Sequence, residues 1–489
     1  MLKQLLLTIV LFLLLTPNAL ATDRAAAGCE EADIATTNGL SSSGDRITVP
    51  AGSCTWTTAI TLTRGVSLVG AGIGQTLILD AGSTTDSLLH ILTGAGEFAE
   101  VSGFTFDING TNRTGNNGVI EVLNTSGADA EDAFRIHHNA FIDVARRGIY
   151  VQSVNNSIGY ELSGVIDNNS FTGTGGNYQY VTCIASTTFA TDPDLAGRPW
   201  TRSLGMGDKH AVYVESNTMS ASGFGDGVLE GYGGCSYVLR YNTIHNSTQG
   251  HHGTDSGGYR GTKRCENYGN SFTADGVSQR GHLYRSGVCY TFNETFDTGY
   301  NITKFHYDLY RDLESGHVGD FGDWGHCDGT HAFDGPEDPM DSNAGADTGH
   351  PCLDQTGWYF AQDLDDAHGV LEPSYSWNIT RDGVQADFQT HVVAEADYIR
   401  EGVEYFNSSF GTLAARPATC AVNELYWVTD QGEWNSTNGA VADGRADVCE
   451  TVNVWTTGAY VPYDYPHPLA AEDEEEAAAS TGGRGRLRR

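Results

Sequence analysis

Positively charged residues are scarce in this chain. Lysine and arginine together number 27, against 62 aspartates and glutamates, and the formal net charge at pH 7 is −35. Only four of the basic residues are lysines. A surface so acidic repels nucleic acids and anionic membranes. The composition therefore predicts that neither is a partner of this protein.

Helical patterning and long apolar runs are largely missing as well. Beyond the first residues, no stretch repeats apolar side chains with a sustained period of about 3.6 residues. The one long apolar run extends from Leu5 to Leu15, after a single lysine and before a small-x-small sequence at 19–21. These features predict a secretory signal peptide over residues 1–21. No other stretch is long and apolar enough to span a bilayer, so we expect a secreted protein, extracellular or periplasmic, without a membrane span.

A short recurring phrase is present instead. Six times an asparagine ends a stretch of alternating apolar residues: Asn139, Asn169, Asn217, Asn242, Asn270 and Asn293. The intervals between them are 30, 48, 25, 28 and 23 residues. A short unit with insertions of variable length is typical of a solenoid. Asparagine tolerates the left-handed backbone conformation, so each of these residues would turn the corner between two strands. Stacked coils would then align the six side chains in a ladder along one edge.

The segments between these corners have the pattern of strands. Sequences such as VSLVGAG, GIYVQS, HAVYVES and YVLRYN alternate apolar and polar positions, and Gly, Asn, Asp and Ser separate them. A propeller would repeat after about 40–45 residues, which is longer than most of the observed intervals. The sequence therefore predicts an all-β fold, a single-stranded right-handed parallel β-helix.

Several longer blocks resemble a known group of proteins. They are the opening phrase ITVPAGSCTW with ITLTRGVSLVGAG, the blocks VYVESNTM, GYGGCSYVLRYNTI and HHGTDSGGYRGTKRCENYGNSF, and the closing YVPYDYPHPL. Over about residues 45–300 the chain resembles the secreted right-handed parallel β-helix proteins of the pectate-lyase-like superfamily, in a bacterial subgroup. The resemblance implies the fold far more than any activity, so the activity has to be inferred from the site itself.

The chain divides into four parts. After the signal peptide we expect the β-helix over residues 22–365, with an acidic loop inserted at about 297–354. Residues 366–469 would form a C-terminal segment that packs on the helix and covers apolar surface. Residues 470–489 are charged and of low complexity, which predicts a disordered tail. We expect the protein to be a monomer.

The acidic loop raises the question of a bound cation. Hard cations take oxygen ligands from acidic, glycine-rich loops, so Ca²⁺ is a candidate ligand of Asp320, Asp323 and Asp328. Their spacing matches no EF-hand loop. The alternative is a solvated group of carboxylates on a very acidic surface.

Ten cysteines in an exported chain predict disulfides. The spacing allows four pairs: Cys29–Cys54, Cys265–Cys289, Cys327–Cys352 and Cys420–Cys449. The remaining Cys183 and Cys235 would pair or stay buried. The alternative is that some of the cysteines are small apolar residues stacked inside the coils.

A basic strip carries the functional hypothesis. Between Arg260 and Arg285 there are five basic residues and only two acids. Arg260 and Arg285 would project from neighbouring coils within about 5 Å, where like charges repel unless an anion lies between them. We therefore predict a cleft for an anionic polysaccharide, with five catalytic residues: Arg260, Lys263, Arg285, His252 and His282. Further contacts to substrate would come from Asp226, Glu230, Asp255, Glu266 and Tyr284.

The predicted reaction is β-elimination on uronate-containing chains. Arginine or lysine would neutralise the sugar carboxylate, and histidine would remove the C5 proton near neutral pH. A C5-epimerase would begin with the same proton abstraction. A glycoside hydrolase would instead use two of the carboxylates Asp226, Glu230, Asp255 and Glu266. Two further alternatives are a carbohydrate-binding or cell-surface β-helix without catalysis, and arginines that only bridge adjacent coils.

Overall fold

The computed structural model describes most of the chain in separate stretches. They are residues 21–109, 117–153, 160–174, 178–185, 202–225, 227–251, 261–276, 281–300, 306–308, 356–359, 370–386 and 405–471. The predicted signal peptide, the three aspartates Asp320, Asp323 and Asp328, and nearly all of the charged tail lie outside these stretches. Within them, no helix has both the length and the apolar character that crossing a membrane requires.

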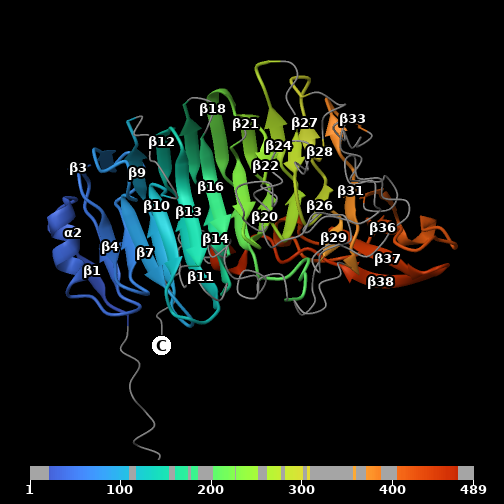
Figure 1. Cartoon of the computed structure of the whole chain (residues 1–489), viewed down its shortest axis with the longest axis horizontal. Coiled ribbons are helices and arrows are strands. Elements are labelled where there is room, and N and C mark those ends of the chain that lie inside the picture. Colours follow the sequence, from blue (N-terminus) through green and yellow to red (C-terminus); the bar gives the residue numbers. More distant parts are fainter. Residues whose placement is uncertain are drawn as a thin grey trace, which may run out of the picture.

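The chain winds as a parallel β-helix whose successive strands visit three sheets in turn (Figure 1). Sheet A has twelve strands: β1 (Asp23–Ala25), β2 (Arg46–Thr48), β5 (Ser67–Val69), β8 (Ala99–Ser102), β11 (Ala130–His137), β14 (Leu162–Asp167), β17 (Val212–Glu215), β20 (Ser236–Arg240), β23 (Arg264–Tyr268), β26 (Val288–Phe292), β31 (Ser374–Trp377) and β34 (Tyr405–Asn407). The all-β fold class predicted from the sequence, a right-handed parallel β-helix with a C-terminal covering segment, is confirmed.

Sheets B and C complete each coil. Sheet B contains β3 (Gly52–Trp56), β6 (Thr76–Asp80), β9 (Phe104–Asp107), β12 (Ala140–Val144), β15 (Ser170–Gly173), β18 (Thr218–Gly225), β21 (Thr243–Ser247), β24 (Ser271–Thr273), β27 (Thr295–Phe296), β32 (Thr380–Arg381) and the antiparallel β33 (Val384–Gln385). Sheet C contains β4 (Ile60–Leu62), β7 (Leu89–Thr93), β10 (Ile120–Asn124), β13 (Arg147–Ser153), β16 (Gln179–Ile184) and β19 (Leu229–Tyr232). In later coils its place is taken by three strands, β22 (Gln249–Gly250), β25 (His282–Tyr284) and β28 (His306–Asp308).

The interior of the helix is a column of stacked side chains. Parallel pairing in register places equivalent residues above one another, as for Phe106, Phe141 and Phe171 on sheet B. The ring centroids of Phe106 and Phe141 are 5.4 Å apart, and those of Phe141 and Phe171 are 4.7 Å apart. Each such buried aromatic ring contributes roughly 1.5–3 kcal/mol relative to an exposed one. The alternating pattern of the sequence therefore forms strands because its apolar positions meet in this column.

The predicted asparagine ladder exists at the corner between sheets A and B. Asn139 Nδ2 donates to Asn169 Oδ1 at 3.1 Å, and the same contact recurs down to Asn242 and Asn270 at 3.0 Å. The backbone N–H of each ladder residue from Asn139 to Asn242 also donates to the side-chain oxygen of the next. All five asparagines are buried.

Two details of the ladder correct the sequence analysis. The residue in the left-handed conformation is the one before each asparagine, as at His138 (φ 52°), Asn168 (φ 53°) and Ser216 (φ 58°). Asn293 occupies this preceding position (φ 54°) and is not a ladder residue. The last member is instead Glu294, whose Oε1 accepts from Asn270 Nδ2 at 2.8 Å. The prediction for Asn293 was wrong because a carboxylate can accept the same hydrogen bond as an amide oxygen.

Disulfides tie the two ends and the middle of the chain. The predicted pairs Cys29–Cys54, Cys265–Cys289 and Cys420–Cys449 are confirmed, and Cys183 and Cys235 also pair. Cys265 and Cys289 stand directly beside each other in the register of β23 and β26. The fourth predicted pair, Cys327–Cys352, lies outside the described residues. Four disulfides are consistent with an oxidising, non-cytoplasmic location.

Short elements close the two ends of the helix. At the N-terminal end lies helix α2 (Glu31–Asn38), and sheet A continues past residue 365, the predicted end of the helical region, with β31 and β34. A small antiparallel pair, β29 (Trp358–Tyr359) with β30 (Val370–Leu371), precedes β31 in the chain. The remaining elements are β35 (Ser409–Gly411), η6 (Leu413–Ala415), β36 (Leu425–Val428), η7 (Ser436–Asn438), β37 (Arg445–Thr451) and β38 (Val454–Tyr460).

Residues 408–471, here called the covering segment, pack on the outer face of sheet A (Figure 1). Trp427, Trp434 and Tyr460 join outward-facing residues of sheet A, including Tyr268 and Phe292, in a second apolar core. Beyond β38 the chain runs back along the helix, because Arg240 donates to the carbonyls of Tyr463 and Asp464 and the N–H of His467 donates to Glu215. Sheet A is therefore closed to ligands over these coils.

Candidate functional site

Up to β28, the longest connections between the described strands run to or from sheet C or the three strands that take its place. Two residues suffice between sheets A and B, as between β14, which ends at Asp167, and β15, which begins at Ser170. By contrast, β16 of sheet C ends at Ile184 and the next strand of sheet A begins only at Val212. Insertions in solenoids collect on one face, which is often the binding face. The outer face of sheet C is therefore the first place to look for a site.

Polar and aromatic side chains follow one another across this face. His90, Glu121, Tyr150, Thr182 and Glu230 stand side by side in the register of β7, β10, β13, β16 and β19. They point outward because their neighbours along each strand belong to the interior core. We call these five residues the outer row. Four of the five are buried, Tyr150 and Thr182 completely, and only His90 is partly exposed.

Arg147 lies next to the outer row. Its guanidinium donates to Gln179 Oε1 at 2.9 Å and to the Tyr232 hydroxyl at 2.7 Å, and it lies 5.3 Å from the ring centroid of Tyr150. The side chain is buried. Arginine over an aromatic ring supplies both a flat stacking surface and a planar set of N–H donors, which suits a sugar carboxylate.

A cavity of about 330 Å³ lies at the edge where sheet C turns into sheet A. Ile184 and Cys183 line it from the end of β16, Glu161 and Leu162 from the start of β14, and residues 202–211 line a further side. Ile184 also packs with Tyr150 and Tyr232 of the outer face of sheet C. The cavity and the outer row are therefore neighbours.

Lys263 lines this cavity. Its backbone N–H donates to the carbonyl of Cys235 at 2.9 Å, and its Nζ donates to the carbonyl of Ser203 at 2.8 Å. The residue is only 5% exposed. Burial, together with the neighbouring charge of Arg264, lowers the pKa of Lys263 to about 7. An amine with this pKa can accept a proton near neutral pH.

The carboxylates on the cavity wall are already paired with cations. Asp129 and Glu161 contact Arg202 at 2.7 and 3.0 Å, and Asp208 contacts Arg264 at 2.9 Å. Glu131 contacts Lys209 at 2.6 Å. The negative charges on the cavity wall are therefore compensated by nearby cations, although the protein as a whole is strongly acidic.

Two of the predicted catalytic and binding residues lie in the interior of the helix. His282 and Tyr284 are fully buried. His282 Nε2 lies 2.5 Å from Glu294 Oε2, at the end of the asparagine ladder. The Tyr284 hydroxyl accepts from Asn267 Nδ2 at 2.5 Å and contacts Thr291 Oγ1 at 2.8 Å. Both side chains hold adjacent coils together and neither faces the cavity or the outer row.

The other described site residues have separate surroundings. Glu266 accepts from the Tyr460 hydroxyl at 2.6 Å and from the N–H of Gly207 at 2.9 Å, beneath the covering segment. Glu230 belongs to the outer row, and Arg285, just past β25, is partly exposed. Arg260, His252, Asp255 and Asp226 lie outside the described residues, as do the three predicted calcium ligands.

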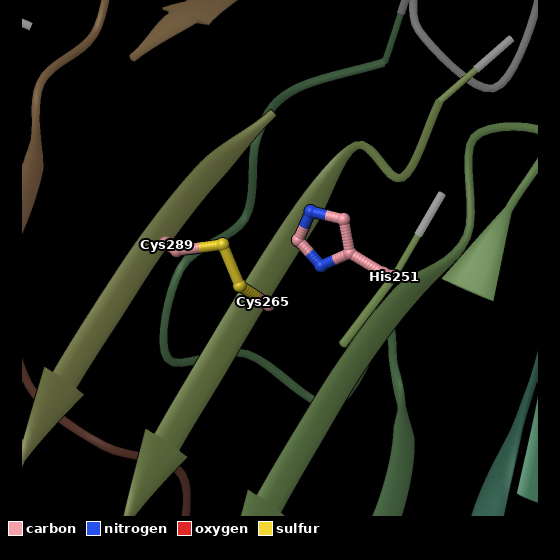
Figure 2. A group of neighbouring side chains, drawn as sticks. All are labelled: His251, Cys265 and Cys289. Carbon is pink, nitrogen blue, oxygen red and sulfur yellow. A yellow bond between two sulfur atoms is a disulfide. The ribbon is translucent and has the colours of Figure 1, made fainter. Parts of the chain in front are cut away.

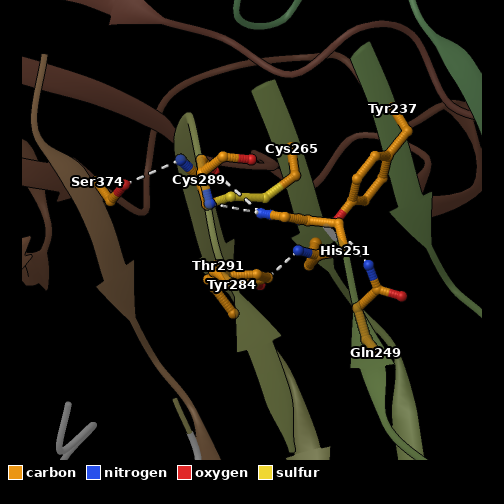
Figure 3. Close-up of a disulfide and its surroundings, with 10 residues drawn as sticks. Tyr237, Gln249, His251, Cys265, Tyr284, Cys289, Thr291 and Ser374 are labelled. Atoms are coloured by element: carbon orange, nitrogen blue, oxygen red, sulfur yellow. Dashed lines mark hydrogen bonds between the residues drawn. A yellow bond between two sulfur atoms is a disulfide. The ribbon is translucent and has the colours of Figure 1, made fainter. Parts of the chain in front are cut away.

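One further group of metal-binding residue types lies inside the helix (Figure 2). His251 stands beside Cys265 and Cys289, whose sulfurs are bonded to each other and therefore offer no thiolate. His251 also has other partners, the Tyr237 hydroxyl at 3.0 Å and the carbonyl of Ser286 at 2.9 Å (Figure 3). Burial lowers the pKa of His251 to about 3, so the ring stays neutral. This group is a structural contact and not a metal centre.

His90 gives the outer row a measurable pH dependence. Its ring lies 2.7 Å from Glu121 and 2.9 Å from Asp86, and pairing with Glu121 raises the pKa of His90 above its ordinary value of 6.5. Protonated His90 therefore stabilises the fold fully below about pH 6.5, and this contribution is lost as the pH rises through the higher pKa of the folded state. We expect the melting temperature of His90→Gln to differ from that of the native chain most at acidic pH and least at alkaline pH. A constant difference across this range would contradict the pairing.

Of the predicted site residues, Lys263 lines the cavity and Glu230 belongs to the outer row. Lys263 was identified from its position in the basic strip. Arg147, Tyr150 and Glu121 were missed, because alternation marks a position as outward without showing which of the three faces it belongs to. If the coils had been aligned on the ladder asparagines, Glu121 would have fallen beside Tyr150, and the outer row would have become visible in the sequence.

Comparison with known proteins adds no assignment: no protein family, no curated protein and no solved structure matches this chain.

Proposed function

We propose that this chain is a secreted protein of the pectate-lyase-like kind that cleaves uronate-containing polysaccharide by β-elimination. The observation that carries the proposal is the buried amine of Lys263, which lines a cavity beside the charged outer face of sheet C. The long connections on both edges of that sheet support the same face as the place where a polysaccharide binds.

The proposed reaction needs a base and a cation. Lys263, with its pKa lowered to about 7, would accept the C5 proton of the uronate, and the C4 oxygen would then leave. A guanidinium would neutralise the sugar carboxylate and stabilise the charge that develops as the proton is lost. The candidates are Arg147, which also donates to Gln179 and Tyr232, and Arg202, which contacts Asp129 and Glu161. A C5-epimerase would use the same base and differ only in returning a proton.

Hydrolysis fits the described residues less well. Glu121 and Glu230 are separated by three strand spacings in register, which corresponds to about 14 Å. The two carboxyl groups of a glycosidase lie about 5–9.5 Å apart. This pair therefore cannot act on one glycosidic bond.

A second candidate function is carbohydrate binding without cleavage. It is favoured by the interior position of His282, which removes one of the predicted catalytic groups from any substrate. Binding of a glycan without formation of unsaturated product would favour this candidate.

The test compares Lys263→Met with Lys209→Met. Each variant is incubated with alginate, pectate and glucuronan, and the ultraviolet absorbance of the unsaturated uronate is followed. Removing a base should lower kcat by about 10²–10⁴-fold while glycan affinity is kept. Lys209 pairs with Glu131 near the cavity and should be replaceable. Full activity of Lys263→Met would contradict its role as the base, and absence of product from the native chain with every substrate would contradict the lyase proposal.

A further inference from the structure

Lys263 has a second chemical capability besides accepting a proton. Its amine is enclosed by protein, lines a cavity and is held by the carbonyl of Ser203. A neutral primary amine in a site with space beside it is a nucleophile toward carbonyl groups. The only other lysine among the described residues, Lys209, is half-buried and paired with Glu131. The two lysines therefore offer an internal comparison.

Arg264 adds a recognition group for an anion. This side chain is fully buried and lines the same cavity. Its terminal nitrogens donate to Asp208 and the carbonyl of Leu204 and lie 3.8 Å from Glu266 Oε1, but its Nε has no hydrogen-bond partner among the described residues. A buried N–H donor without a partner costs about 1–3 kcal/mol, so a ligand that accepts this hydrogen bond gains by binding here.

We propose that this cavity binds a small 2-oxo acid as a Schiff base on Lys263, with the carboxylate of the ligand on the Nε of Arg264. The cavity of about 330 Å³ has room for such a ligand. This inference goes beyond the proposed polysaccharide chemistry and does not depend on it, because the ligand is a free small molecule.

The covalent step balances without an oxidant or a metal. The lone pair of neutral Nζ attacks the keto carbon, and the keto oxygen takes a proton to give a carbinolamine. The hydroxyl then leaves as water, and a carbon–nitrogen double bond forms. Burial lowers the pKa of Lys263 to about 7, so near neutral pH this amine is neutral about three orders of magnitude more often than an ordinary lysine. The ligand therefore meets the amine in its reactive form.

Borohydride trapping tests the proposal on the full-length chain. The protein is incubated with pyruvate, reduced with sodium borohydride and digested, and the adduct is located by peptide mass mapping. We expect one reduced pyruvate adduct on Lys263, with at least about tenfold less on Lys209, and its yield should rise as the pH passes about 7. Lys263→Arg keeps the charge and should show no adduct on the corresponding peptide.

Two outcomes would overturn the proposal. Equal labelling of Lys209 and Lys263 would mean that the cavity confers no reactivity, and absence of adduct at Lys263 in the correctly folded chain would mean that no Schiff base forms. The carboxylate contact is tested with pyruvamide, which has the same keto group without a charge. We expect about tenfold less adduct from it, and equal labelling by both compounds would overturn the role given to Arg264. Because no polysaccharide is present, failure here and failure of the lyase assay are separate results.

Discussion

Replacing Arg240 with methionine should destabilise the protein by about 3–5 kcal/mol, because it leaves a buried carboxylate without its partner. Arg240 is fully buried and contacts Glu215 at 2.6 Å. It also donates to the carbonyls of Tyr463 and Asp464, at 2.7 and 2.8 Å. One side chain thus holds the covering segment on sheet A. Chemical denaturation measures the loss, and limited proteolysis should show earlier cleavage near residue 463.

The matched control is Arg46→Met. Arg46 pairs with Asp23 at 3.2 Å, and both side chains are largely exposed, so this change should cost at most about 1 kcal/mol. The double variant Arg240→Met with Glu215→Met should recover part of the loss, because no unpaired charge then remains buried. If Arg240→Met is no less stable than Arg46→Met, the buried pair does not hold the segment.

The second large effect is expected for Asn217→Ala in the middle of the ladder. Asn217 Oδ1 accepts from the backbone N–H of Asn169 at 2.9 Å, and its Nδ2 donates to the carbonyl of Ile166 at 2.9 Å. Alanine leaves these buried groups without partners at about 1–3 kcal/mol each, so we expect a total loss of about 3 kcal/mol or more. Thermal and urea unfolding of the variant measure it.

The control for the ladder is Asn168→Gly. Asn168 stands directly before a ladder residue and has a left-handed backbone (φ 53°), which glycine adopts without strain. This variant should therefore keep nearly full stability. Equal losses for Asn168→Gly and Asn217→Ala would mean that the turn, and not the side-chain hydrogen bonds, sets the stability of this edge.

These residues also show how far the sequence could lead. The recurring asparagines predicted the fold because one chemical requirement, an amide at a corner, repeats in every coil. Glu294 was not predicted as a ladder residue because it accepts the same hydrogen bond with a carboxylate instead of an amide. The burial of Arg240 and Glu266 could not be predicted, since it depends on the covering segment, whose contacts lie about 200 residues away along the chain. The cavity at Lys263 was missed for the same reason: residues 202–211 complete it from a distant part of the sequence.

The ladder has an electrical direction. Every amide from Asn139 to Asn270 donates toward the C-terminal end, so their dipoles add, and the last one points its N–H group at the carboxylate of Glu294. Aligned hydrogen bonds polarise one another in a medium of low dielectric constant. The asparagine ladder thus acts on Glu294 as the N-terminus of a helix acts on an anion. A buried glutamate can end the asparagine ladder because the positive ends of the amide dipoles in the preceding coils point toward it.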